Sequence, residues 1–359
     1  MVESANAQAL GIGRLAWQAA LAGMVGLALA GPAAAQDGAA AGVAGYDGAD
    51  RMEKLAAAAR EEGSLMIYTS APVEDMQALI EPFEAKYGVK VEVWRGSSEA
   101  TLQRAVTETR AGRYDVDLVE TNGPELEALY REQILQPIKS PTLAQLLPSA
   151  VPAHGAWIGT RLNVITAAYN TSLVGAAEVP KVWEDLLKPE WKSRLGIEAE
   201  DFDWMATVAA SFAKEEDGIA FFRKLGESNG YSVRKGHTLL TNLVASGEVP
   251  FALTVYQYKA AQLKEKGAPV DWLAIPPAAA RVNGVGLSRT APHPNAAVLF
   301  VEFELTEGQK ILAERGFTPT NIKVQPLPAD LQISVIDSAK MLDESQKWRD
   351  LYQDIVLRK

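Results

Sequence analysis

The stretch TNLVASGEVPFALTVYQYKAAQLKEKGAPVDWLAIPP, residues 241–277, indicates how the chain folds. It contains a helix that ends at Gly247, followed by the short apolar run Val249–Val255, whose composition and flanking turn residues predict a buried strand. Tyr256 and Tyr258 follow, where the strand gives way to the next helix. Ligands bind at the carboxyl ends of strands in open α/β sheets, so these tyrosines mark a candidate ligand site.

The first 35 residues have the pattern of a secretory signal peptide. Arg14 precedes the apolar, small-residue run Leu15–Ala30, which is too short for a stable membrane span. An A-x-A cleavage pattern ends at Ala35, so we expect cleavage there, a flexible leader over residues 36–48 and a periplasmic location. A retained N-terminal anchor is the alternative. No cysteine follows the apolar run, which excludes a lipoprotein anchor.

Composition limits the class of protein further. The chain has 359 residues, a formal net charge of −10 and no cysteine. The part beyond the signal peptide is too long for one small core and suits two lobes. Without cysteine, an exported protein must rely on burial rather than on disulfides. An acidic chain without basic runs is a poor binder of nucleic acid, so we expect no nucleic-acid partner.

Three strand–turn–helix units follow the leader. Strands are predicted over residues 64–68, 89–94 and 115–120, each followed by a helix, and this alternation predicts a mostly parallel, doubly wound α/β sheet. Residues 156–169 are predicted to form a longer strand that crosses into a second lobe. Further α/β units follow up to residue 275.

The turns after the first three strands have a common chemistry. They read Thr69-Ser70, Gly96-Ser97-Ser98 and Thr121-Asn122-Gly123, and each lies at a predicted helix N-terminus. Small polar side chains and free N–H groups at such positions favour anions and polar ligand groups. Any one of these turns is best explained as a helix cap. Their repetition along one sheet edge predicts a rim that faces a ligand.

Several segments resemble the extracellular solute-binding proteins of ABC importers, particularly the ferric-iron-binding branch. The resemblance covers nearly all of residues 63–320. It rests on GEVPFAL…Y.Y…LKEKGAPVDW (residues 247–272), VWEDLLKPEWKSRLGI (182–197), NGVGLS (283–288) and FTPT (317–320). The tryptophans of the second motif, Trp183 and Trp191, are expected to be core residues.

The resemblance implies a type II periplasmic binding fold, with two doubly wound α/β lobes, crossing hinge strands and a ligand cleft between the lobes. Lobe 1 is then expected at residues 49–157 plus 283–359, and lobe 2 at residues 158–282. By the same resemblance, the protein captures a small solute by hinge closure and delivers it to an ABC permease in the inner membrane. It is expected to act as a monomer, and a receptor that feeds a sensor is an alternative.

Ferric iron is one possible ligand. Iron binders of this branch typically present two adjacent tyrosines and often a histidine after the first strand. Here the sequence is Tyr256-Gln257-Tyr258, and Thr69-Ser70-Ala71-Pro72 follows the first strand. Residues two apart at a helix start do not share a face. Iron held by Tyr256 and Tyr258 is therefore the alternative, and packing is the expected role of Tyr258.

We expect instead a small organic anion or zwitterion. The candidate ligand-binding residues offer polar groups or a flat ring, and they are Thr69, Ser70, Ser97, Ser98, Asn122, Asp203, Trp204, His237, Thr238 and Tyr256. Arg95 or Arg234 could clamp a carboxylate or phosphonate. Asp203 among aromatic residues would instead suit a polyamine-type cation, which stays an alternative.

Catalysis is not expected. The chain lacks a G-x-S-x-G elbow, an H-E-x-x-H zinc motif, a phosphate loop and any cysteine nucleophile. Its three histidines are scattered along the sequence. A secreted enzyme that uses dispersed carboxylate pairs stays an alternative, because such pairs are recognised only by geometry. No cofactor is expected.

Overall fold

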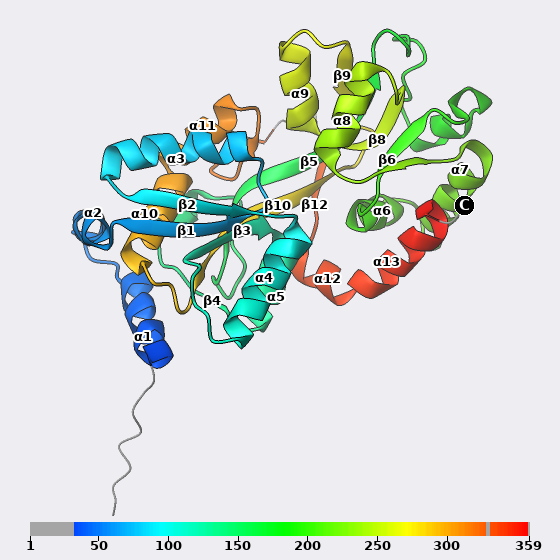
Figure 1. Cartoon of the computed structure of the whole chain (residues 1–359). Coiled ribbons are helices and arrows are strands. Elements are labelled where there is room, and N and C mark those ends of the chain that lie inside the picture. Colours follow the sequence, from blue (N-terminus) through cyan, green and yellow to red (C-terminus); the bar gives the residue numbers. More distant parts are fainter. Residues whose placement is uncertain (1–31, 328–330, 358–359) are drawn as a thin grey trace, which may run out of the picture.

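The computed structural model describes residues 32–327 and 331–357 and consists of two α/β lobes joined by long strands (Figure 1). The predicted signal peptide therefore lies almost wholly outside the described residues. Among the described helices, none combines the length and the apolar character needed to span a membrane.

Lobe 1 contains the three predicted strand–helix units. Its parallel strands are β1 (Ser64–Thr69), β2 (Lys90–Arg95) and β3 (Leu118–Asn122), and its helices are α2 (Arg51–Glu62), α3 (Val73–Tyr87), α4 (Ser98–Arg110), α5 (Gly123–Arg131), α10 (Pro294–Leu305) and α11 (Glu307–Glu314). Gly63 and Gly88 adopt the left-handed conformation that ends α2 and α3, as Gly without a Cβ readily does. The carboxyl ends of the strands all point toward the other lobe (Figure 1).

Two antiparallel strands cross between the lobes. They are β5 (Ile158–Asn170) and β10 (Ala278–Ser288), and almost every residue in them is buried. The strands of the shared sheet run in the order β2-β1-β3-β10-β5-β8-β6-β7. The register pairs Arg281 with Asn163 and Asn283 with Arg161, which places four polar side chains at the middle of the crossing.

Lobe 2 contains residues 241–277, whose helix–strand–helix pattern was predicted from the sequence. Its strands are β6 (Leu195–Glu198), β7 (Ser232–Arg234), β8 (Phe251–Tyr256) and β9 (Val270–Leu273), and its helices are α6 (Phe202–Ala209), α7 (Glu215–Asn229), α8 (His237–Ser246) and α9 (Gln257–Glu265). As predicted, α9 begins directly after Tyr256, and Trp183 and Trp191 are core residues.

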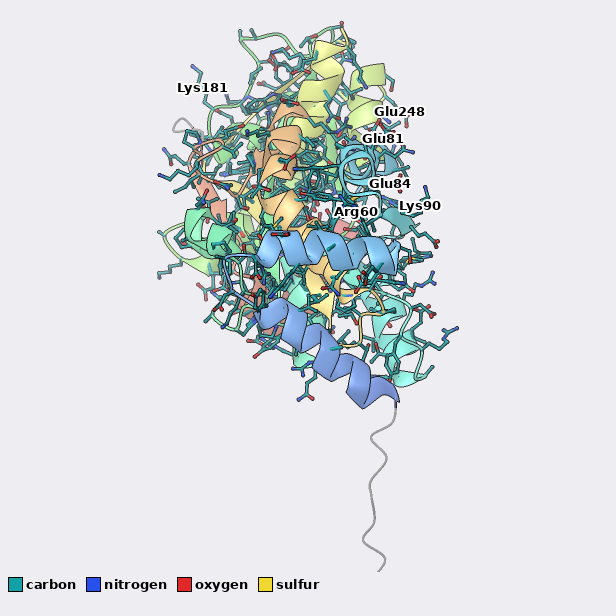
Figure 2. All side chains as sticks on the ribbon, turned by 90° about the vertical axis from the view of Figure 1, so that its left-hand side faces the viewer. Arg60, Glu81, Glu84, Lys90, Lys181 and Glu248 are labelled. Carbon is teal, nitrogen blue, oxygen red and sulfur yellow. The ribbon has the colours of Figure 1, made fainter. Side chains whose placement is uncertain are left out.

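The segment before α2 differs from its prediction. Residues 36–48 were expected to be a flexible leader, but helix α1 (Pro32–Gly45) occupies most of them. Ala40 and Ala44 are fully buried in the lobe 1 core, and α1 packs against α10. Figure 2 shows α1 below α2 on the outer side of lobe 1. An alanine-rich sequence favours a helix once a partner surface covers it.

The C-terminal segment also differs from the expected division, which placed residues 283–359 in lobe 1. Helix α12 (Ser338–Asp343) packs on α5 of lobe 1, but α13 (Ser345–Tyr352) packs on α6 of lobe 2. Trp348 and Tyr352 are buried in the lobe 2 core. The segment therefore forms a third connection between the lobes.

Candidate ligand-binding cleft

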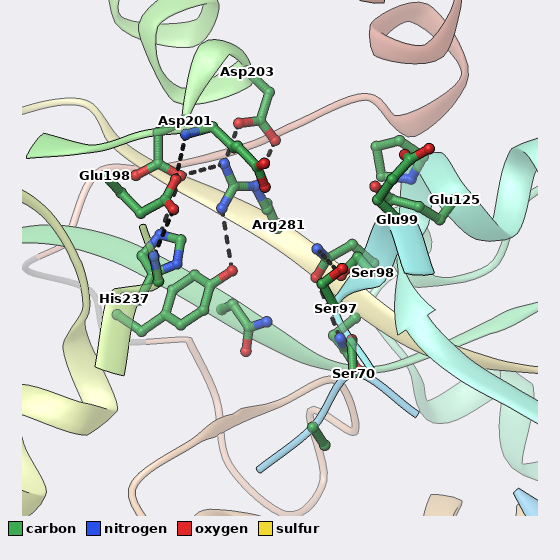
Figure 3. A pocket seen from close by; sticks show the side chains of 18 of the residues that line it. Ser70, Ser97, Ser98, Glu99, Glu125, Glu198, Asp201, Asp203, His237 and Arg281 are labelled. Atoms are coloured by element: carbon green, nitrogen blue, oxygen red, sulfur yellow. Dashed lines mark hydrogen bonds and ion pairs between the residues drawn. The ribbon is translucent and has the colours of Figure 1, made fainter. Parts of the chain in front are cut away.

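A cavity of about 410 Å³ lies between the lobes. Its walls come from the carboxyl ends of the lobe 1 strands, from β6 and β8 of lobe 2, from the crossing strands and from the C-terminal segment. Figure 3 shows the two sides facing each other, with serines and two glutamates on the lobe 1 side and an ion-paired cluster on the lobe 2 side.

The lobe 1 wall carries three serine hydroxyls, those of Ser70, Ser97 and Ser98. Each oxygen already accepts a hydrogen bond from within lobe 1: Ser70 from Thr121 Oγ1 (3.1 Å), Ser97 from the backbone N–H of Ala100 (3.1 Å) and Ser98 from Asn122 Nδ2 (2.9 Å). Each of these bonds uses one of the two lone pairs of its oxygen, so each hydroxyl keeps its proton and one lone pair for the cavity. The serine rim, Ser70, Ser97 and Ser98, therefore offers three hydroxyl donors.

Arg95, Glu99 and Glu125 complete this wall. Arg95 Nε donates to the carbonyl oxygen of Ala71 at 3.4 Å, a bond that does not use its two terminal nitrogens. Burial raises the pKa of Glu125 to about 7, with a smaller contribution from Asp203 across the cavity. Glu125 can thus change charge near neutral pH, depending on what occupies the cleft.

The crossing strands supply the polar floor of the cavity: Arg161 and Asn163 from β5, and Arg281 and Asn283 from β10. Arg161 Nη1 donates to Glu120 Oε1 at 2.5 Å, which ties this arginine to lobe 1. Among the described residues, Arg161 Nε, Asn163 Oδ1 and Asn283 Oδ1 are buried without a hydrogen-bond partner. Such atoms are costly unless a ligand or water satisfies them.

Arg281 organises the lobe 2 wall. Its guanidinium donates to Asp203 Oδ2 (2.5 Å), Asp201 Oδ1 (2.7 Å) and the hydroxyl oxygen of Tyr256 (3.1 Å). Burial opposes the charged form, but the two aspartates and Tyr256 keep the pKa of Arg281 well above its ordinary value. Burial likewise disfavours ionised Asp201, whose pKa is nevertheless held below its usual range by His237 and Arg281.

His237 and Tyr256 form a stacked pair, with ring centroids 3.9 Å apart and planes 9° from parallel. His237 Nε2 lies 3.1 Å from Asp201 Oδ1. Burial raises the pKa of Tyr256 to about 12, although Arg281 acts in the opposite direction. The phenol therefore stays protonated at neutral pH.

The cavity brings together most of the residues that the sequence suggested. Ser70, Ser97, Ser98, Asn122, Asp203, His237, Thr238 and Tyr256 line it, as does Arg95.

Three expected residues do not line the cavity. Thr69 is fully buried, and its hydroxyl oxygen accepts the N–H of Ala71 beneath the wall. Trp204 is a core residue, packed edge-on against Trp183 with centroids 5.6 Å apart. Arg234 is not one of the lining residues, and its Nη2 lies 3.3 Å from Glu248 Oε1.

The sequence interpretation missed the charges that dominate the lobe 2 wall and the floor, namely Arg161, Glu198, Asp201 and Arg281. One signal was available for the arginines. Arg161-Leu162-Asn163 and Arg281-Val282-Asn283 repeat the pattern Arg-x-Asn inside strands that are otherwise apolar or small. Charged residues are rarely fully buried without a partner, so an arginine in such a strand indicates a site.

Tyr258 occupies a position between wall and core. It borders the cavity, but its ring centroid lies 4.0 Å from that of Phe317 in lobe 1, and the residue is only 5 % exposed. Its ring centroid lies 5.9 Å from that of Tyr256. Burial raises the pKa of Tyr258, which disfavours the phenolate that ferric iron prefers.

Comparison with known proteins is consistent with this geometry. The family model described as bacterial extracellular solute-binding protein matches residues 78–336. The Fe(3+)-binding periplasmic protein of Serratia marcescens is 26 % identical over 303 residues, which cover 80 % of this chain and 89 % of that protein. Iron uptake protein A1 of Synechocystis sp. is 26 % identical over 276 residues, 72 % of this chain and 75 % of that protein.

Solved structures share the two-lobe architecture. Iron-bound HitA from Pseudomonas aeruginosa has a TM-score of 0.69 at 24 % identity and covers 81 % of this chain and 99 % of its own. The periplasmic binding protein AfuA from Actinobacillus pleuropneumoniae, with fructose-6-phosphate bound, has a TM-score of 0.72 at 22 % identity and covers 83 % and 99 %. These likenesses confirm the expected periplasmic binding fold, and at such identities they show the fold alone.

Proposed function

The chain belongs to the bacterial extracellular solute-binding protein family, and we propose that it is the substrate-binding subunit of an ABC importer for a small organic anion or zwitterion. The two lobes would close on the solute by bending at the crossing strands, and the closed form would dock on a membrane permease. The cleft between β5, β10 and the two walls is the capture site.

The observation that carries the solute class is the serine rim. Each of the three hydroxyls accepts one hydrogen bond from its own lobe and keeps its proton free to donate to a ligand. Ser97 is the N-cap of α4, where the helix dipole and unpaired N–H groups also favour negative charge. Arg95 adds a cation to the same wall. An oxygen-rich anionic group, such as a carboxylate, phosphate or phosphonate, matches this set of donors.

The acidic groups of the cleft support a second polar end on the solute. Glu99 and Glu125 lie beside the serine rim, and Glu198 lies across the cavity. Carboxylates accept hydrogen bonds from hydroxyl or ammonium groups. A solute with an anionic end and hydroxyl or amine groups uses both types of contact, so a zwitterion fits as well as a simple anion.

Two alternative ligands are less well supported by the geometry. For a polyamine, the attraction of Asp203 is lost, because Arg281 already neutralises this carboxylate. For ferric iron, the Tyr258 ring packs on Phe317, and the Tyr256 hydroxyl oxygen accepts a hydrogen bond from Arg281. An enzymatic role is not proposed. Its test is whether the bound solute is recovered unchanged after incubation with the protein.

Isothermal titration calorimetry with carboxylates, phosphates, phosphonates, amino acids, polyamines and Fe(III) tests the proposal. We expect an anionic or zwitterionic compound to bind one-to-one. The double variant Ser70→Ala/Ser98→Ala should weaken its binding at least about tenfold, because hydrogen bonds to charged groups contribute about 1.5–3 kcal/mol each. Ser246→Ala, an exposed serine of α8 outside the cavity, is the matched control. Binding of polyamine or iron alone, or unchanged anion affinity in the double variant, would refute the proposal.

A further inference from the structure

Glu198, Asp201 and His237 form a compact group on the lobe 2 wall. One ligand atom from each lies within 4.8 Å of the others, and all three residues line the cavity. Glu198 is 3 % exposed and Asp201 is fully buried. The three residues come from three separate places: the end of β6, the turn before α6 and the start of α8.

Two residues of this group have a polar atom that no internal hydrogen bond uses, whereas each carboxylate oxygen of Glu198 accepts one backbone N–H. Among the described residues, Asp201 Oδ2 and His237 Nε2 are buried atoms without a hydrogen-bond partner. His237 Nε2 lies 3.1 Å from Asp201 Oδ1, but in a geometry that makes no hydrogen bond. Two such atoms facing one small volume are costly unless something occupies it.

The orientation of each group is fixed by its neighbours. Glu198 Oε1 accepts the backbone N–H of Gly236 at 2.9 Å, and Asp201 Oδ1 accepts from Arg281 at 2.7 Å. The His237 ring is held by its stack on Tyr256. Outer contacts of this kind orient metal ligands in proteins and raise their affinity.

Three carboxyl groups and one guanidinium lie together on this wall. Glu198, Asp201 and Asp203 bring the carboxyls, and Arg281 pairs with Asp201 and Asp203. A divalent ion held by Glu198 and Asp201 would compensate the charge that these two carboxylates carry when they bind it.

We propose that Glu198, Asp201 and His237 bind a divalent transition-metal ion of the Zn²⁺ class. One imidazole nitrogen and two carboxylate oxygens suit this class, and three protein ligands leave a fourth position open. The ligand atoms must contract to about 3.3 Å separations, since metal–ligand bonds are about 2.0–2.2 Å long. This set contains neither Tyr256 nor Tyr258, so it is distinct from the tyrosine-based iron alternative.

Glu198, Asp201 and His237 lie across the cavity from the serine rim (Figure 3). A bound ion would therefore give the lobe 2 wall a cationic contact for an anionic solute, opposite the hydroxyl donors of lobe 1. This second step rests on the proposed function. Metal binding by itself does not, because the ion needs no solute to bind.

The test uses the full chain without a polyhistidine tag, stripped with chelator and titrated with Zn²⁺ alone by isothermal titration calorimetry. We expect one ion per chain. His237→Gln should weaken Zn²⁺ binding more than about tenfold, because loss of a direct ligand costs at least as much as loss of an outer-shell partner. The matched control is His293→Gln, a lobe 1 histidine paired with Asp117 at 3.0 Å and absent from the cavity lining, which should leave the affinity unchanged.

Glu198→Gln is the second variant, with thermal melting as a check that both variants fold. It should also weaken Zn²⁺ binding, and visible absorption of bound Co²⁺ should change in both variants. Absence of one-to-one binding, or equal affinity in His237→Gln and the parent, would overturn the inference. If the stripped protein binds no Zn²⁺ but still binds its organic anion, the proposed function stands while the metal site fails.

Discussion

The two walls of the cleft present polar groups in different ways. The serine rim of the lobe 1 wall offers neutral hydroxyls close to helix N-termini, each held by one hydrogen bond from its own lobe. The lobe 2 wall offers buried charges, with Arg281 fixed between Asp201 and Asp203. Lobe 1 keeps its own buried ion pair, Arg161 with Glu120, at the floor and behind the serine rim.

Because of this difference, substitutions in the two walls should affect solute affinity and the free energy of unfolding to different extents. A neutral hydroxyl can be removed at small cost to folding, because it leaves no unpaired charge. A buried ion pair cannot lose one partner without leaving the other uncompensated. Changes in the lobe 1 wall should therefore act on solute affinity, and changes in the lobe 2 wall should act on stability as well.

The largest effect is expected for Arg281→Met. Methionine fills a similar volume but leaves Asp201 and Asp203 buried without their cation. Removing one partner of a buried pair typically costs about 3–5 kcal/mol. Urea unfolding at neutral pH measures this loss in the free energy of unfolding.

Arg349→Met is the control for that experiment. Arg349 also lines the cavity, but the contact it makes is with the ring of Phe202, 4.4 Å from the centroid. Its replacement should cost less than about 1 kcal/mol. An equal loss in the free energy of unfolding for both variants would mean that the ion pairs of Arg281 with Asp201 and Asp203 are no more important for stability than the ring contact of Arg349.

A pH-dependent effect is expected for Glu304, a buried residue of α10. Burial, with a smaller contribution from Glu120, raises its pKa to about 8. Because the folded pKa exceeds the unfolded value of about 4.3, the unfolded chain releases this proton first as pH rises, and stability falls between about pH 4.5 and 8. The slope is at most about 1.4 kcal/mol per pH unit.

Glu304→Gln removes this ionisable group and should therefore reduce the pH dependence of the free energy of unfolding. Between pH 5 and pH 8, the free energy of unfolding of the variant should rise by roughly 2–4 kcal/mol relative to that of the parent. Urea unfolding at a series of pH values measures both curves. Parallel curves would show that Glu304 is ionised in the folded protein and that lobe 1 tolerates a charge behind its wall.

A smaller effect, on affinity, is expected for Tyr256→Ala. It removes the ring that supports His237 and the hydroxyl bonded to Arg281. Solute binding should weaken about tenfold or more, because His237 and Arg281 each lose a contact that holds them in position. Tyr256→Phe keeps the ring and should retain most of the affinity. If calorimetry finds Tyr256→Ala equal to the parent, Tyr256 is not part of the site.

Much of the fold could be predicted from the sequence because its signals are local. Glycines that end α2 and α3, a proline near the start of α5 and short apolar runs mark the elements to within a few residues. The serine rim followed from the same local pattern of strand, turn and helix. The helix α1 could not be predicted this way, because its stability depends on contact with α10.

Most of the lobe 2 wall could not be predicted from the sequence, because its residues come from segments that are far apart along the chain. Arg281 is 80 residues from Asp201 and 78 from Asp203, and only the return of β10 through the cleft brings them together. The prediction that Trp204 lines the ligand site was wrong because of its local sequence context. A tryptophan beside polar residues resembles a ligand platform, but helix periodicity turns its ring into the core.

Native mass spectrometry of protein isolated gently from periplasm shows whether the cleft holds a small organic anion or zwitterion. We expect a bound mass that corresponds to one such molecule per chain, and we expect it to be lost in Ser70→Ala/Ser98→Ala. A bound mass of ferric iron or of a polyamine, retained in that double variant, would contradict this expectation.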